Sequence, residues 1–392
     1  MQRFSANYIF TNTGNPIRNG IVEVDNTGKV VQVIDPKGKE RELARTEFHN
    51  GIIVPGFVNT HCHTELAHLK NRVEGGKGLA SFVNSIRDNR LKGETASQSA
   101  IDDAINELGR LGVVAVADIC NTPDSFISKE KSSVRFINLI EVLGLEPQMP
   151  DAIIDRARLI KTVQEQKGKD DCFITPHSTY SLSEKLWKQL REELGSHQVV
   201  SIHFAESKAE EMFTMHRNGP IANNYNSWGL PLNSAPAGSL KNIVKKYIPK
   251  SATVLFIHNV FLTKEDLHDI SNHFSNAYFV FCPESNLYLE NRLPDIDMFY
   301  KLGVKIALGT DSPASCISLS VFEQIKIIAN HFPSIPFADL LLWATKNGAQ
   351  ALALNSTIGS IEPGKTPGLN LISPFNFSTM KPLEDSKVRR LL

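Results

Sequence analysis

The sequence has few of the features that mark proteins of membranes, nucleic acids or the secretory pathway. No apolar run in its 392 residues is long enough to cross a bilayer, and the first residues lack the charged and apolar regions of a secretory signal. Lysine plus arginine equals aspartate plus glutamate at 42 each, and no long basic run occurs. We therefore expect a protein that binds neither a nucleic acid polymer nor a membrane.

Cysteine is scarce, and its spacing excludes a familiar metal or redox motif. The sequence has 5 cysteines and no CxxC pair: Cys62, Cys120, Cys172, Cys282 and Cys316. A purely structural zinc site usually needs cysteines that lie close together in the sequence. Several of these cysteines lie within apolar runs, where cysteine acts as a small hydrophobic residue. The pattern predicts a reduced, cytoplasmic protein.

Short apolar runs, separated by stretches of helical periodicity, are what the sequence has in abundance. Eight runs stand out, at residues 56–61, 112–120, 134–142, 171–178, 198–207, 252–259, 276–286 and 304–312. Most are continuously apolar rather than alternating, as expected of parallel strands that are covered on both faces. Eight strand–helix units predict an α/β fold, a closed (β/α)8 TIM barrel, over residues 54–354.

The segments between the runs have the signals of helices. The segment after Ser183 places Leu186, Trp187, Leu190 and Leu194 on one face, with Ser183 as its N-cap. Thr263 precedes another segment that has acidic residues in its first turn. Both segments are predicted helices that cover the barrel.

The two chain ends differ from the middle. Residues 1–53 contain short alternating strands with Asn-Thr-Gly turns, and residues 355–392 again indicate turns and strands. We expect one small β-sandwich domain built from both ends, with the barrel inserted between them.

Ionisable and amide side chains recur where the predicted strands end. They are His61, His63, Asp118, Glu141, His177, His203, Glu206, His258, Asn286 and Asp311. In a barrel these positions form the C-terminal face, where active sites are built. Asp118 and Glu141 are interpreted as polar groups of the barrel with local partners, and we leave them outside the predicted site.

The segment VPGFVNTHCHTELAHLK contains His61 and His63 one residue apart. Alternate side chains of a strand point to the same face, so the two imidazoles are expected to project together. A divalent metal would bind both as neutral ligands; the simpler interpretation is a strand end with two ordinary polar residues.

A catalytic metal needs three or four nitrogen or oxygen ligands and an open position for water. His61, His63, His203 and Asp311 can supply that set, and a bound metal would lower the pKa of water to roughly 7. Glu206 is predicted to shuttle protons as a general acid and base. His258 is predicted to hydrogen-bond to the nucleophile or to the oxyanion.

The chain resembles the amidohydrolase superfamily in its deaminase and chlorohydrolase branch, close to its aminodeoxyfutalosine deaminase-like members. The matching segments are PGFVNTHCH, TPHSTYSLSE, IHFAES, LFIHNV, CPESN, ALGTDSPAS and GSIEPGK, in the family's order. The resemblance implies one divalent metal, zinc or ferrous iron, bound by His61, His63, His203 and Asp311. It also implies catalytic roles for Glu206, His258 and Asp311. The fourth barrel strand lacks the lysine that binuclear members carry, which favours a single metal.

Three further residues are predicted to contact the substrate. His177 resembles a substrate-contacting residue of the deaminase branch, with a cap on the following helix as the alternative. Glu65 lies where similar deaminases have a substrate-contacting glutamate, with a loop ion pair as the alternative. Asn286 completes the set, with a structural turn as the alternative.

The resemblance implies a hydrolytic deaminase that attacks an amino-substituted purine-like or other N-heteroaromatic ring with metal-bound hydroxide and releases ammonia. The alternatives are a chlorohydrolase or amidase that uses the same water, and an inactive barrel that serves in binding or assembly. Glu284 stands where the deaminase group often has a basic residue, which leaves the substrate open. The expected partners are a small-molecule substrate and a second copy of the chain in a homodimer.

Overall fold

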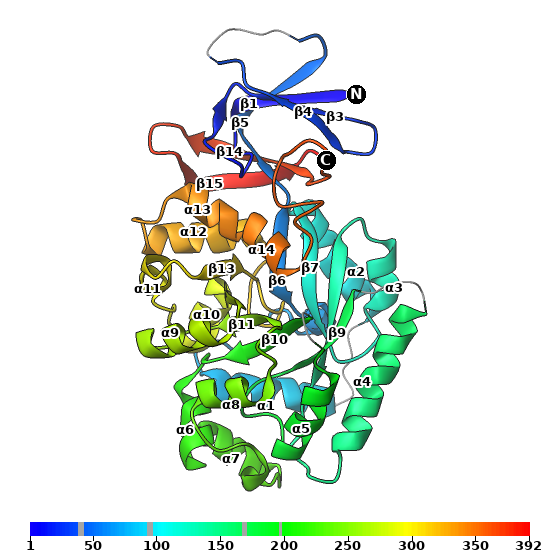
Figure 1. Cartoon of the computed structure of the whole chain (residues 1–392), viewed down its shortest axis with the longest axis vertical. Coiled ribbons are helices and arrows are strands. Elements are labelled where there is room, and N and C mark those ends of the chain that lie inside the picture. The colour runs from blue at the N-terminus through cyan, green and yellow to red at the C-terminus, as the bar shows by residue number, and fades with distance from the viewer. Residues whose placement is uncertain (38–42, 92–96, 167–170, 196–197) are drawn as a thin grey trace.

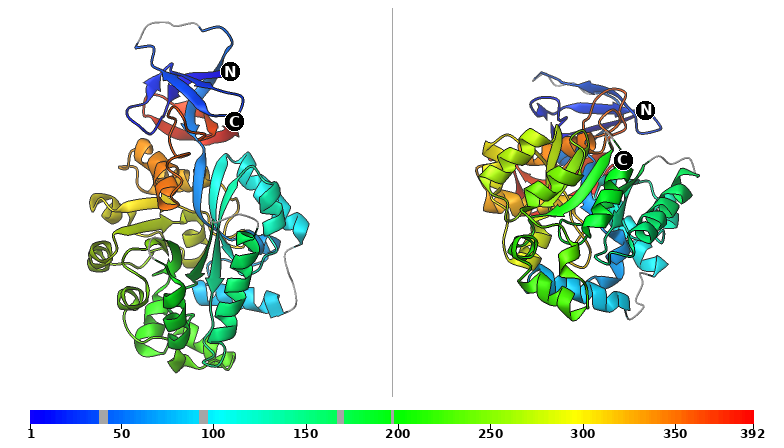
Figure 2. Two further views of the ribbon diagram at one scale, coloured as in Figure 1. Left: turned by 45° about the vertical axis from the view of Figure 1, so that its right-hand side comes forward. Right: turned by 60° about the horizontal axis from the view of Figure 1, so that its bottom comes forward.

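The computed structural model describes residues 1–37, 43–91, 97–166, 171–195 and 198–392 (Figure 1). A small sheet that contains both chain termini stands at one end of a larger barrel, as Figure 1 and the left view of Figure 2 show. All five cysteines are buried and free. Among the described residues, no helix is both long enough and apolar enough to pass through a bilayer.

The small sheet brings the two chain ends together. Its strands are β1 (Gln2–Ile9), β2 (Ile17–Arg18), β3 (Ile21–Val24), β4 (Val30–Ile34), β5 (Thr46–Pro55), β14 (Leu369–Asn376) and β15 (Lys381–Arg390). They form one continuous sheet in the order β15-β14-β5-β1-β3-β4, with β2 beside β1. The sheet is continuous because the long strand β5 pairs with β1 along most of its length and with β14 at its end. β5 runs to Pro55, so a division of the chain at residue 53 falls inside a strand and stays a proposal.

The predicted (β/α)8 barrel is confirmed, with one strand for each of the eight apolar runs. The strands are β6 (Phe57–Cys62), β7 (Val113–Cys120), β8 (Arg135–Val142), β9 (Cys172–Pro176), β10 (Val199–Phe204), β11 (Thr253–His258), β12 (Asn276–Phe281) and β13 (Lys305–Leu308). They form two parallel four-stranded sheets, β6 to β9 and β10 to β13.

Two isolated bridges close these sheets into a barrel. At one junction Ser178 pairs with His203, and at the other Cys62 pairs with Asp311. The backbone N–H groups of Thr310 and Asp311 both donate to the His61 carbonyl at 3.0 Å. Gly309 allows this close approach, because a Cβ there would lie 2.8 Å from the Cβ of His61. Barrel closure thus brings Asp311 beside His61.

The helices surround the barrel. They are η1 (Thr64–Leu69), α1 (Leu79–Leu91), α2 (Gln98–Arg110), α3 (Phe126–Lys131), α4 (Pro150–Glu165), α5 (Glu184–Glu193), α6 (Lys208–His216), α7 (Pro220–Ser227), η2 (Leu232–Ser234), α8 (Leu240–Tyr247), α9 (Lys264–His273), α10 (Pro283–Glu290), α11 (Ile296–Lys301), α12 (Val321–His331), α13 (Phe337–Trp343) and α14 (Lys346–Ala351). The predicted N-caps are confirmed: Ser183 accepts from the N–H of Leu186, and Thr263 accepts from that of Asp266. Helices α1, α6 and α7 lie at the end of the barrel away from the small sheet (Figure 1).

Strand alternation divides the apolar side chains between two cores. Ile137 and Leu139 of β8 belong to a cluster with Leu255 and Ile257 of β11, which fills the barrel interior. The alternate side chains of each strand point outward and pack against the helices in a second cluster. Val116 of β7 belongs to this outer cluster. A polar side chain at a strand end therefore points either into the barrel or toward the surrounding helices, according to its place in this alternation.

Candidate active site

Four of the predicted side chains converge at the carboxyl ends of three strands. His61 and His63 come from the end of β6, His203 from β10 and Asp311 from the loop after β13. The Nε2 atom of His63 lies 3.1 Å from that of His61 and 3.3 Å from that of His203. The Oδ1 atom of Asp311 lies 3.5 Å from the Nε2 atoms of both His61 and His63. All four residues are buried.

Hydrogen bonds to neighbouring groups turn two of these side chains toward the centre. His203 donates its Nδ1–H to the carbonyl of His177 at 2.9 Å, so its Nε2 has a lone pair directed at the other rings. The Oδ2 atom of Asp311 accepts hydrogen bonds from the hydroxyls of Ser285 and Ser315, both at 2.6 Å. The Oδ1 atom is thereby left to face the histidines.

The electrostatics of the cluster favour neutral rings around a carboxylate. Burial lowers the pKa of His203 to about 3, and it holds the pKa of His63 well below its usual value. Burial would raise the pKa of Asp311, but the hydrogen bond from His61 and the proximity of His63 hold it well below its usual range. Neutral imidazoles and an ionised carboxylate are the forms in which these groups bind metals.

The cluster therefore fits a divalent metal. Three imidazole nitrogens and one carboxylate oxygen lie within 4.8 Å of one another, with no lysine or arginine among them. Nitrogen and oxygen donors of this kind suit zinc and ferrous iron, and a set of three histidines with one carboxylate is typical of catalytic rather than structural sites.

Glu206 and His258 lie beside this cluster. Glu206 is buried, and burial, with Asp311 nearby, raises the pKa of its carboxyl well above the usual value. Its Oε1 lies 3.5 Å from Nε2 of His258. Asn286 donates its Nδ2–H to Nδ1 of His258 at 2.9 Å, so a neutral His258 ring has its proton on Nε2, toward Glu206.

The backbone is unusual at these strand ends. Ala205, His258 and Asp311 have positive φ angles of 49°, 75° and 62°. Non-glycine residues rarely adopt this left-handed region, and such positions concentrate at functional sites. The turn at Ala205 separates His203 from Glu206 and allows both side chains to reach the same cavity.

Three members of the cluster, His63, His203 and Asp311, line a cavity of about 390 Å³. Residues of the strand ends, α1, α7 and the loop after β8 line it: His63, Leu66, Leu79, Phe82, Val83, Ile86, Arg87, Asn121, Glu141, Leu143, Gly144, Leu145, Glu146, His177, Tyr180, Ser181, His203, Glu206, Tyr225, Trp228, Leu230, His258, Asp311 and Ser312. Polar groups concentrate at the metal end, and apolar and aromatic side chains of α1 and α7 form the outer wall. This arrangement suits a small planar molecule with a polar reacting end.

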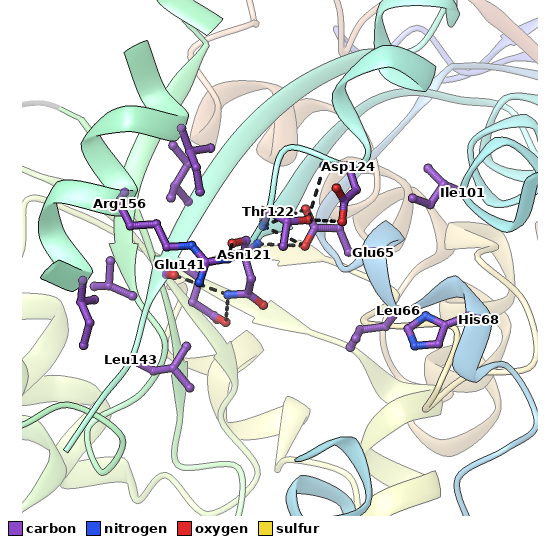
Figure 3. Close-up of a pocket in the computed structure, with 15 residues that line it drawn as sticks. Glu65, Leu66, His68, Ile101, Asn121, Thr122, Asp124, Glu141, Leu143 and Arg156 are labelled. Carbon is purple, nitrogen blue, oxygen red and sulfur yellow. Dashed lines mark hydrogen bonds between the residues drawn. The ribbon is translucent and has the colours of Figure 1, made fainter. Parts of the chain in front are cut away.

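The structure separates the three predicted substrate contacts. His177 lines the cavity, and its Nδ1 lies 3.0 and 2.9 Å from the hydroxyls of Ser178 and Ser181. Asn286 lies behind His258, outside the lining of this cavity. Glu65 lines an adjacent cavity, where it accepts hydrogen bonds from the N–H groups of Asn121 and Thr122 (Figure 3). Direct substrate contact by these residues stays a prediction.

Two acids at the strand ends, Glu141 and Asp118, were left outside the predicted site, and the structure places them in different surroundings. Glu141 of β8 lines the active-site cavity, on the interior face that it shares with Ile137 and Leu139. Asp118 of β7 points outward, where it pairs with the buried Lys129 of α3 at 2.5 Å. The period-two alternation of each strand was the signal that distinguishes them.

Comparison with known proteins agrees with this geometry. The profile of the amidohydrolase family matches residues 52–388. A curated adenosine deaminase of Helicobacter pylori is 27% identical over 354 residues, which covers 88% of this chain and 85% of the relative.

Two solved structures have the same fold. The crystal structure of Helicobacter pylori aminofutalosine deaminase in complex with methylthio-coformycin superposes with a TM-score of 0.80 at 23% identity, and covers 96% of this chain and 93% of its own. That of an adenosine deaminase from Xanthomonas campestris with bound zinc has a TM-score of 0.72 at 20% identity, with coverage of 98% and 87%.

Proposed function

The chain belongs to the amidohydrolase family, and on that premise we propose that it is a metal-dependent hydrolase that deaminates a purine-like ring. Water replaces the exocyclic amino group of an N-heteroaromatic substrate, and ammonia leaves. The names of the matching relatives, an adenosine deaminase and an aminofutalosine deaminase, support a 6-aminopurine nucleoside or a related small molecule as substrate.

One observation carries the proposal: a buried carboxyl with a raised pKa and a histidine face a metal-type ligand set in one cavity. Glu206 lies 3.5 Å from His258, beside the cluster of three histidines and Asp311. An inactive binding protein has no need for a buried carboxyl whose pKa is raised by burial beside a metal-type cluster. Perturbed acids and bases beside a metal-type cluster are instead typical of active sites.

In this proposal His61, His63, His203 and Asp311 hold one divalent metal, zinc or ferrous iron. The donor set supports either ion, and the zinc-containing structural relative supports the first. When bound, a divalent metal of this kind lowers the pKa of water to roughly 7 and so supplies a nucleophile at neutral pH.

The protein's own groups move the protons. Glu206 is proposed to take a proton from the attacking water and to give it to a ring nitrogen, because burial raises the pKa of its carboxyl and so makes it a better proton acceptor than an exposed glutamate. His258 donates from Nε2 to the oxygen that attacks the ring, and Asn286 keeps that proton on Nε2. Asp311, ionised and hydrogen-bonded by two serines, is proposed to hold the attacking oxygen in place together with His258.

The outer wall of the cavity suits a substituted heterocycle. Phe82, Tyr225 and Trp228 supply aromatic faces, and Arg87 lies 4.5 Å from the centroid of the Trp228 ring. Rings of this kind stack on planar ligands and exclude water from the reaction.

Two broader properties are also proposals. The five free, buried cysteines support a reducing compartment and thus a cytoplasmic location. A homodimer is the oligomeric state we propose, and sedimentation analysis of the purified protein would test it.

An ammonia-release screen tests the proposed function. Purified protein that has been loaded with zinc or ferrous iron would be mixed with aminopurine nucleosides, pterins and amino-triazines, with a chelator-treated sample as the control. We expect ammonia from at least one aminopurine compound, and none after chelation. Chloride from a chlorotriazine, or an amine from an amide, without any ammonia would replace the deaminase by a chlorohydrolase or an amidase.

A further inference from the structure

Glu141 presents a buried carboxyl oxygen, Oε1, that accepts no hydrogen bond from the residues the structure describes; Nδ1 of His203 lies 3.7 Å from it and gives its proton to the His177 carbonyl instead. The residue ends β8 on the interior face of the barrel and is 8% exposed. Its Oε2 accepts a hydrogen bond from Nδ2 of Asn121 at 3.1 Å (Figure 3). Its Oε1 has no hydrogen-bond partner among the described residues. A buried acceptor without a donor costs about 1–3 kcal/mol, so such a group calls for an explanation.

Glu141 lies in the wall between two cavities. One is the active-site cavity, and the other, of about 350 Å³, lies between η1, α4 and the loop after β7. The two cavities share Leu66, Asn121, Glu141 and Leu143. Glu206, His258 and Asp311 line only the active-site cavity. A ring that reacts beside those three residues would thus direct a substituent, rather than the ring itself, toward Glu141.

A second metal is the first alternative, because Glu141, His177 and His203 offer ligand atoms within 4.8 Å of one another. The donor set does not support it. His203 has its Nδ1–H bound to the carbonyl of His177, and its Nε2 belongs to the four-residue cluster. Its ring therefore has no lone pair left, and two ligands remain, which is too few for a protein zinc site.

A cationic ligand is the second alternative, and the neighbouring charge opposes it. Arg156 lines the adjacent cavity, and its guanidinium lies 3.4 Å from the backbone oxygen of Asn121 (Figure 3). A ligand ammonium at Glu141 would meet this positive charge. A neutral donor such as a hydroxyl satisfies the free oxygen without that repulsion.

We propose that Glu141 is a specificity-determining residue whose Oε1 accepts a hydrogen bond from a hydroxyl on the substituent of the reacting ring. The ligand class is a hydroxylated, sugar-bearing heterocycle rather than a free base. This inference rests on the proposed function for the identity of the ring, whereas the contact itself is a binding property and can be measured apart from turnover.

The test compares Glu141→Gln with the native protein on three probes: adenosine, 2′-deoxyadenosine and 3′-deoxyadenosine. Both proteins are metal-loaded. A hydrogen bond to a charged acceptor is worth about 1.5–3 kcal/mol, which corresponds to a loss of roughly 10- to 100-fold in kcat/KM for adenosine. The loss should lie in KM, since the contact is equal in the ground and transition states. For the analogue that lacks the contacted hydroxyl, we expect a change of less than about threefold.

Two controls accompany this comparison. Glu146→Gln removes a carboxylate from the same cavity but not the acceptor at β8, so any change should be equal for all three probes. Metal content and the urea unfolding midpoint of Glu141→Gln should match those of the native protein.

Calorimetric binding in a Glu206→Gln background provides a readout that does not depend on turnover. We expect adenosine to lose roughly 10-fold or more in affinity on addition of Glu141→Gln, and one deoxy analogue to lose none. An equal loss for all probes, no loss at all, no adenosine binding, or a metal content that falls from two to one would overturn the inference. Discrimination in binding without ammonia from any aminopurine would overturn the proposed function and leave the inference standing.

Discussion

Asp118 and Glu141 are two acids at the ends of neighbouring barrel strands, and the molecule treats them in opposite ways. Asp118 faces outward, where Thr64 donates to it from its backbone N–H at 2.9 Å and its hydroxyl at 2.5 Å. Lys129 completes the set and also donates to Asn138 at 2.8 Å and to Cys120 at 3.2 Å. Glu141 faces the barrel interior, and among the described residues its Oε1 accepts no hydrogen bond, with Nδ1 of His203 3.7 Å away.

This difference in pairing distinguishes a polar cluster that stabilises the fold from one that can bind a ligand. Around Asp118 every charge has its partner: burial alone would lower the pKa of Lys129, but Asp118 raises it, so the ammonium stays charged. At the interior end of the barrel, neutral histidines, Glu206 and Glu141 are only partly satisfied by one another. A fully paired cluster holds the fold, whereas an incompletely paired one has capacity left for a ligand.

The largest expected effect is a loss of turnover from a substitution in the incompletely paired cluster of the barrel interior. Glu206→Gln removes the group that we assign to proton transfer, so turnover should fall by roughly 10²- to 10⁴-fold while the metal is retained. Ammonia-release kinetics and metal analysis of the same sample measure both quantities.

Glu211→Gln is the matched control for that variant, because Glu211 is exposed on α6, the helix that begins two residues after Glu206. It should leave turnover unchanged. Retained turnover in Glu206→Gln would remove the proposed mechanism.

The next largest effect is expected on the fully paired side, in stability rather than in turnover per folded molecule. Lys129→Met leaves Asp118 buried without its counter-charge, which should lower the free energy of unfolding by about 3–5 kcal/mol. Urea denaturation measures this change. The double variant Lys129→Met/Asp118→Asn should recover part of the loss, and a double variant as unstable as the single one would contradict the ion-pair account.

The effect of zinc on thermal stability should also distinguish the cluster around Asp118 from the histidine cluster of the barrel interior. A ligand that binds only the folded state stabilises it, by about 2.7 kcal/mol at a free concentration 100-fold above Kd. Thermal unfolding with zinc and with a chelator should therefore differ in the native protein and in Lys129→Met. It should not differ in His63→Ala, which lacks a ligand of the cluster. An unchanged zinc response in His63→Ala would contradict the assignment.

The smallest effect concerns Glu210, which accepts the N–H groups of Glu206 and Ser207 at 2.7 and 3.0 Å. Burial raises the pKa of this carboxyl to about 8. The folded protein therefore keeps a proton that the unfolded chain releases above about pH 4.5, so this group's contribution to the free energy of unfolding falls as pH rises from 4.5 to 8.

Glu210→Gln keeps an oxygen acceptor but cannot titrate. We expect stability at pH 5 to change by at most about 1 kcal/mol, the size of one neutral hydrogen bond, and the decline toward pH 8 to become shallower. Urea midpoints at pH 5 and pH 8 for both proteins measure the difference. A steeper decline in the variant would contradict the raised pKa.

Much of the fold was predictable because its signals are local. Each barrel strand is a continuous apolar run, and caps such as Ser183 and Thr263 fix helix starts within a few residues. The convergence of His61, His63, His203 and Asp311 follows from the rule that parallel strands of a barrel end on one face.

The remainder depends on contacts between distant segments. Lys129 reaches Asp118 from a short helix, and no spacing rule indicates that contact. Asn286 lies behind His258 because α10 begins directly after β12, which the CPESN segment does not reveal by itself. Glu141 was within reach of the sequence, because it continues the Ile137 and Leu139 alternation into the barrel interior.

The most direct test of the account is a metal titration of the depleted protein. Chelator-treated protein would receive zinc, or ferrous iron without oxygen, in small steps, while bound metal and ammonia release from the best aminopurine substrate are followed together. The account predicts that the rate rises in proportion to bound metal and levels off at about one ion per chain, as a single catalytic site requires. Full turnover without metal, or a plateau only at about two ions per chain, would contradict it.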